Sequence, residues 1–256
     1  METLKTILDL PERCLVGKKI TKAFFKRNFD LTKAEKTLLE DIAIVVGIDW
    51  IASISHTSTN IVGYQDESFL FEEIQVISIE TTVVNFDKNS QRIADLIQKY
   101  IPYPILLCVW CDSCYILNTC DKRVNQNDKS RRTVDKSYYT ELIAVVEPTE
   151  RQKAFLKSLL FGELDKSNLK SFYDSYTQRI IALLTAQIDG QYKPRTQIRT
   201  KADLDNLEKI EALEKEIVSM QNQAKKESQL NLQVSLNTQI QMKRKQIKKL
   251  KELIIA

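Results

Sequence analysis

The last 56 residues constrain the fold most strongly, because the segment 201–256 contains neither glycine nor proline. Apolar residues recur there at alternating spacings of three and four, from Ile210 to Ala224 and again from Leu236 to Ile254, where Lys243 takes one position of the series. This spacing predicts a coiled-coil seam in two pieces. The twelve-residue step between the pieces breaks the heptad phase, and the polar stretch 221–229 fills it. We therefore favour an antiparallel helical hairpin, the alternative being one long helix with a stutter.

Composition excludes a disordered or low-complexity chain. Hydrophobic residues make up 43% of the 256 residues and the net charge is only +4, which is compatible with a sizeable core. No apolar stretch reaches the roughly 20 residues that span a bilayer. The first residues mix charged with apolar side chains, which argues against a signal peptide. Five cysteines, an odd number, favour a reduced, cytoplasmic protein.

Residues 1–148 are predicted to form an α+β domain with a mostly antiparallel sheet. Segment 71–83 alternates like a strand, with Ile74, Val76 and Ser78 on one face and Glu73 and Gln75 on the other. Further strands are expected at 104–110, 115–118 and 138–146, and helices at 18–29, 32–45 and 89–100. Residues 49–62 fit short extended pieces and loops, Thr32 with Glu35 predicts a capping box, and Pro102 should end the third helix. Residues 149–190 should form helices packed on this domain, 191–200 a linker, and 201–256 the coiled coil.

The cysteines and the single histidine are the candidates for a metal or catalytic site. Cys108, Cys111, Cys114 and Cys120 have a spacing that could hold zinc or an iron–sulfur cluster. Because strand side chains alternate, however, we expect Cys108 and Cys111 to face opposite sides of the sheet. The single histidine, His56, has no nucleophile motif beside it. We therefore predict no metal site and no cofactor.

A nuclease centred on Glu73 is the alternative enzymatic interpretation. Nucleases of the restriction-enzyme type place an acidic residue on one strand and Glu-x-Lys or Glu-x-Gln on the next, and the carboxylates bind Mg²⁺. Glu73 and Gln75 match the second part, with Asp49 or Asp66 as the further acid. A polar sheet face explains the same residues without catalysis.

Basic residues gather near the end of the chain. Residues 191–256 contain 14 Lys and Arg against 8 Asp and Glu, a net of +6, so residues 1–190 have a net of −2. Such a cluster can neutralise phosphates, or it can simply be a solvated helix face. The candidate nucleic-acid-binding residues are Lys243, Arg244, Lys245, Lys248 and Lys249.

Several segments together resemble the bacterial family catalogued as domain of unknown function 4391. They are Leu10-Pro11, Lys18–Phe25, Ser58–Ile61, Glu73–Val76, Ile101–Leu106 and Glu227–Asn237. The chain departs from the family pattern at Leu230, where Phe is usual, and at Ser228, where Lys is usual. The resemblance implies no activity. It implies a context, in which such proteins are encoded beside helicases and DNA methyltransferases in restriction-like or phage-defence operons.

The sequence thus favours a non-catalytic adaptor over an enzyme. The expected partners are a helicase or a DNA methyltransferase, with possible DNA contact and possible self-association through the coiled coil, and without a membrane. A polar Asn on an apolar seam can set pairing specificity. The residues predicted to bind a partner are Gln229, Asn231, Val234, Asn237, Ile247 and Leu250.

Overall fold

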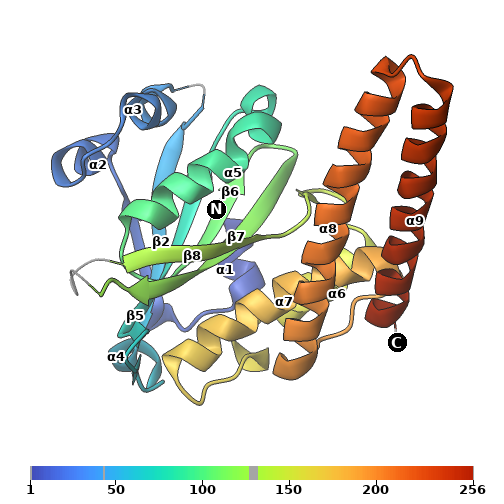
Figure 1. Ribbon diagram of the computed structural model, residues 1–256. Coiled ribbons are helices and arrows are strands. Elements are labelled where there is room, and N and C mark those ends of the chain that lie inside the picture. Colours follow the sequence, from blue (N-terminus) through green and yellow to red (C-terminus); the bar gives the residue numbers. More distant parts are fainter. Residues whose placement is uncertain (1, 43, 127–131, 256) are drawn as a thin grey trace.

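The computed structural model describes residues 2–42, 44–126 and 132–255, and it has an α+β fold, as predicted. A mixed sheet lies between two layers of helices, and a long helical hairpin stands beside it (Figure 1). The sheet order is β1-β2-β5-β6-β7-β8, with β9 also beside β7. Its strands are β1 (Leu15–Lys19), β2 (Gly47–Ser55), β5 (Glu73–Glu80), β6 (Ile105–Trp110), β7 (Cys114–Val124), β8 (Arg132–Tyr139) and β9 (Ile143–Ala144); β3 (Tyr64–Gln65) and β4 (Leu70–Phe71) form a separate ribbon.

Strand β5 lies in the interior of the sheet and contributes to both cores. Ile74 and Val76 pack on one face, and Ile77 and Ile79 pack on the other, which confirms the predicted alternation. The pairing of β5 with β6 is parallel, whereas the other pairings within the sheet are antiparallel. A parallel pair needs a crossover connection, and helix α5 (Val83–Tyr100) provides it.

Each face of the sheet is covered by its own set of helices. Helices α2 (Lys22–Asn28), α3 (Lys33–Glu40) and α5 cover the face that carries Ile77. Helices α1 (Glu2–Leu8), α6 (Glu150–Ser158) and α7 (Leu169–Asp189) cover the opposite face. The short α4 (His56–Thr59) and the 3₁₀ turns Glu12–Cys14 and Phe161–Glu163 complete the described elements of this part.

Some predicted boundaries were wrong for reasons of tertiary pairing. Lys18 and Lys19 lie in β1, paired with β2, and the helix starts only after the N-cap Thr21. The region after Asp49, expected as short pieces, is the nine-residue strand β2, because it pairs with a neighbour on each side. Helix α5 begins at Val83, six residues before the predicted start, since its exposed β-branched first turn gives no helical signal. The predicted capping box of Thr32 and Glu35 is present.

The C-terminal segment is an antiparallel hairpin of α8 (Gln197–Lys226) and α9 (Leu230–Ile255), as favoured above. Helix α8 begins within the predicted linker, after the N-cap Thr196. The two predicted apolar series meet each other in one seam. Its buried members are Ile210, Ile217, Ile240, Ile247 and Ile254, with Leu213, Met220 and Leu250 packed against them. Of the helices in the described residues, none combines the length and the apolar character needed to cross a membrane.

A buried carboxylate joins the two ends of the hairpin at its base. Asp203 is fully buried and lies 3.4 Å from Arg195 Nε and 3.0 Å from Arg199 Nε. Arg199 Nη2 also donates to the carbonyl oxygens of Leu253 and Ile254 at 2.7 Å, and Arg195 Nη2 donates to Ile254 at 3.2 Å. Cations at a helix C-terminus are favourable, so this cluster fixes the end of α9 to the start of α8.

We expect Asp203→Ala to lower the free energy of unfolding by about 3 kcal/mol, because it leaves two arginines without their buried counter-charge. Amide hydrogen exchange should increase in the last turns of α9. The control Asp205→Ala, an exposed carboxylate two residues away, should change the stability by less than about 0.5 kcal/mol. Equal effects of the two variants in urea unfolding would contradict the role given to Asp203.

Candidate functional site

A groove of about 510 Å³ opens at one end of the sheet, on the face that α5 covers. Three segments far apart in sequence form it, namely β1 with the start of α2, the pair β2–β5, and the loop after α5. All three contain segments that carry the family resemblance: Lys18–Phe25, Glu73–Val76 and Ile101–Leu106. Aromatic side chains line much of the groove, and two lysines lie at its edge. The principal lining residues are Lys18, Lys19, Phe24, Trp50, Glu73, Gln75 and Tyr103.

A chain of hydrogen bonds runs along the floor of the groove. Trp50 Nε1 donates to Gln75 Oε1 at 2.6 Å and to the carbonyl oxygen of Ala52 at 3.1 Å. Ser53 Oγ donates to Glu73 Oε2 at 2.9 Å. The strand pairing is irregular beside these residues, between Trp50 and Ala52 in β2 and between Leu15 and Lys18 in β1, where Gly17 has a φ of 63°. The resulting site offers a carboxylate, an amide and flat aromatic surfaces, which suit a ligand with a polar edge.

A buried lysine holds the loop that forms one wall of the groove. Lys122 Nζ donates to the carbonyl oxygens of Ile101 and Tyr103, each at 2.7 Å. The Gln75 N–H donates to the carbonyl oxygen of Pro104 at 2.9 Å. Burial lowers the pKa of Lys122 to about 8. Burial and the nearby Glu73 carboxylate raise the pKa of the Tyr103 phenol. Pro102 therefore ends α5 as expected, and the loop is also fixed against the sheet.

The structure does not bring together the acids that the nuclease interpretation requires. Asp49 pairs with Ser78, five residues along β5 from Glu73, a separation of about 17 Å. Asp66 accepts the Tyr64 hydroxyl and two backbone N–H groups in its own turn. The residues of β2 that lie opposite Gln75 and Glu73 are serines, not acids. Across the described residues, no group of three or more His, Cys, Asp or Glu side chains is placed to hold a metal ion.

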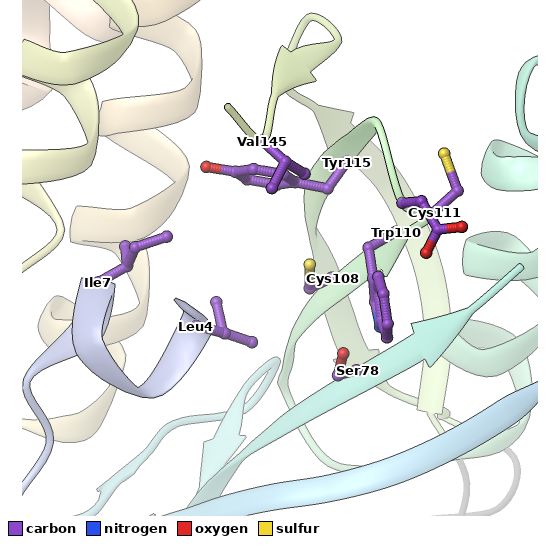
Figure 2. A pocket seen from close by; sticks show the side chains of 9 residues that line it. Leu4, Ile7, Ser78, Cys108, Trp110, Cys111, Tyr115 and Val145 are labelled. Atoms are coloured by element: carbon purple, nitrogen blue, oxygen red, sulfur yellow. The ribbon is translucent and has the colours of Figure 1, made fainter. Parts of the chain in front are cut away.

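The cysteines are divided between the two faces of the sheet. Cys108 packs in the core beneath α7, whereas Cys111 and Cys114 pack in the core beneath α5. This division confirms the expected opposite orientation of Cys108 and Cys111. Figure 2 shows the cavity of about 160 Å³ beside Cys108, bounded by Leu4 and Tyr115, with the sulfur of Cys111 pointing away from it. His56 lies exposed at the start of α4.

The predicted partner-binding residues fall into two groups. Ile247 and Leu250 belong to the internal seam of the hairpin. Gln229, Asn231, Val234 and Asn237 are exposed at or near the turn between α8 and α9. Part of this segment shapes the turn itself. Glu227 accepts the N–H groups of Ser228 and Gln229, and Gln233 Nε2 donates to its carbonyl oxygen at 2.6 Å.

The exposed surface of helix α9 differs chemically between the first and the second half of the helix. The half from Leu230 to Met242 contains no charged residue, and its exposed apolar side chains include Leu230 (74% exposed), Leu232 (44%) and Val234 (56%). We call these three residues the apolar tip. The half from Lys243 to Ile255 has six basic residues and one acidic residue, a net of +5. Lys243 pairs with Glu216 on α8, whereas Arg244, Lys245, Lys248 and Lys249 are exposed. These four residues form the basic face.

Comparison with known families assigns the chain to a family. The model of the family described as "Domain of unknown function (DUF4391)" matches residues 8–247, nearly the whole chain. The chain therefore belongs to this family, as its motifs indicate. Comparisons with curated proteins and with solved structures give no match.

Sequence reasoning missed Trp50 and Tyr103, which line the groove, and Lys122, which holds the loop that forms its wall. Their positions depend on the order of the strands, which a single sequence does not give. Alternation along β7 gives no signal for Lys122, because residues on both faces of the strand are buried from Cys114 to Cys120.

We expect Lys122 to make stability depend on pH. Because its pKa is about 8 in the folded chain and 10.5 ordinarily, the unfolded chain binds more protons between these values. The free energy of unfolding contributed by Lys122 therefore rises with pH in this window. From pH 8 to 10, wild type should gain on the order of 2 to 3 kcal/mol relative to Lys122→Met in denaturant titrations. For the exposed control Lys88→Met, the difference from wild type in the free energy of unfolding should be the same at pH 8 and pH 10. A difference that is also the same at both pH values for Lys122→Met would refute the assignment.

Proposed function

We propose that this chain is a non-catalytic adaptor subunit of a DNA-processing complex, acting through the α8–α9 hairpin. The basic face contacts nucleic acid, and the apolar tip contacts a protein partner. The family context described above suggests a helicase or a DNA methyltransferase of a restriction-like or phage-defence system as that partner.

The closed seam of the hairpin carries this proposal. Five isoleucines from the two helices cover each other, so the hairpin needs no second chain to bury its apolar stripe. The apolar tip and the basic face both lie outside this seam. Exposed apolar side chains beside Asn and Gln are typical of a protein interface, where apolar contact is combined with hydrogen bonds.

Charge supports the nucleic-acid contact. Helix α8 has six basic and six acidic residues, so the +5 net charge of α9 is not neutralised by its neighbour along the hairpin. A concentrated positive face attracts the phosphate backbone without reading its sequence. Aromatic residues are absent from α9, which favours contact with phosphates over stacking on bases.

We expect charge reversal of the basic face to weaken DNA binding. In fluorescence anisotropy with a labelled duplex, the variant with Arg244, Lys245, Lys248 and Lys249 changed to Glu should bind more weakly. The slope of log affinity against log salt should fall in magnitude by about 3 to 4 if each side chain meets one phosphate. The control carries the same charge change at exposed Lys33, Lys36, Lys88 and Lys157, and it should bind like wild type. Unchanged affinity of the first variant would refute the contact.

We expect the apolar tip to be needed for complex formation. Affinity purification from the native host, with nuclease treatment, should recover a helicase or methyltransferase in stoichiometric amount with wild type. The double variant Leu230→Asp, Val234→Asp should lose it, and the control Val84→Asp, which is 91% exposed on α5, should keep it. Recovery of the chain alone would contradict the adaptor function. Mg²⁺-dependent DNA cleavage that Glu73→Ala abolishes would replace it with the nuclease alternative.

A further inference from the structure

Cys111 and Cys114 form a close pair of thiols at the turn between β6 and β7. Their sulfur atoms are 3.5 Å apart, and the Cys111 N–H donates to the carbonyl oxygen of Cys114 at 2.9 Å. They are the first and last residues of a four-residue turn, whose ends lie within about 7 Å of each other. That limit is compatible with the Cα separation that a disulfide requires. With the sulfurs 3.5 Å apart, a short approach of the side chains would bring them to bonding distance.

The other three cysteines have different surroundings. Cys14 donates to the carbonyl oxygen of Ser58, and Cys120 donates to Gln98 Oε1. Cys108 lies on the opposite face of the sheet from the pair. Burial raises the pKa of Cys108 to about 12 and that of Cys120 to about 11. Cys108 and Cys120 are therefore poorly suited to the first attack on a peroxide, because the thiolate is the reactive form.

The thiols of Cys111 and Cys114 differ from each other in the direction of their pKa shifts. Burial acts to raise the pKa of Cys111, but hydrogen bonds with Ser113 and Cys114 outweigh it and lower the pKa. Burial and the neighbouring Cys111 raise the pKa of Cys114 to about 11. Both side chains lie just beneath a surface turn, since Asp112 and Ser113 between them are exposed. This arrangement places the more acidic thiol, Cys111, beside a second thiol.

We propose that Cys111 and Cys114 are a peroxide-sensitive dithiol that closes reversibly to a disulfide. The Cys111 thiolate attacks one oxygen of a hydroperoxide, the O–O bond breaks, and the leaving hydroxide or alkoxide takes a proton from water. Cys111 is then a sulfenic acid. The Cys114 sulfur attacks Cys111 Sγ, the S–O bond breaks, and water leaves with the proton of Cys114. Two electrons pass from the sulfurs to the peroxide, and a small dithiol reductant returns them.

The test uses the full chain with hydrogen peroxide as the probe. Wild type should lose two of its five free thiols and two hydrogen atoms in intact mass, with peptide mapping linking Cys111 to Cys114 and dithiothreitol restoring both thiols. The control Cys108→Ser should behave in the same way. In Cys114→Ser, a dimedone probe should trap sulfenic acid at Cys111. These variants are compared only where their thermal unfolding matches wild type.

The wild-type measurement decides the proposal without any variant. Loss of thiols spread evenly over the five cysteines, or an unchanged intact mass after peroxide treatment, would overturn it. A disulfide that joins a different pair of cysteines would overturn it as well. Absence of dimedone labelling at Cys111 in folded Cys114→Ser would refute the assignment of Cys111 as the attacking thiol.

Discussion

The parallel pairing of β5 with β6 is the constraint on which the rest of the arrangement depends. It requires a crossover, so α5 must cross one face of the sheet and return through residues 101–104. That return loop becomes a wall of the groove, held by Lys122 and by the Gln75 backbone. With α5 on one face, the other face is left to α7, whose far end supplies Ile188 to the base of the hairpin.

Two parts of the molecule thus offer surfaces of different character. The groove is preformed, with an aromatic lining and a floor of fixed hydrogen bonds, and it lies among elements that pair over long sequence distances. The hairpin is local in sequence and meets the sheet through the first half of α8, where Glu208 pairs with Lys136 of β8. Partner binding at the hairpin would therefore leave the geometry of the groove unchanged, because few contacts connect them.

The sequence predicted features whose cause is local. The alternation of β5, the capping box of Thr32 and Glu35, and the phase break that becomes the hairpin turn all depend on residues close in the chain. It did not predict β2, because that strand is defined by partners on both sides. The candidate site was harder still. Glu73 was found from its motif, but the identity of its neighbours, serines from β2 and Tyr103, depends on strand order and register.

The turn at Glu227 has a mechanical consequence. Helix α9 is continuous, packs along α8 and is fixed at its base by the Asp203 cluster. The apolar tip and the basic face are therefore held at a set spacing. From Val234 to Lys248 this spacing is about 21 Å along the axis. The α8–α9 hairpin therefore acts as a rigid spacer. A protein partner bound at the apolar tip and a duplex bound at the basic face would be kept at a fixed distance and angle. Lengthening both helices by one heptad would increase that distance while preserving the seam, whereas lengthening one alone would break it.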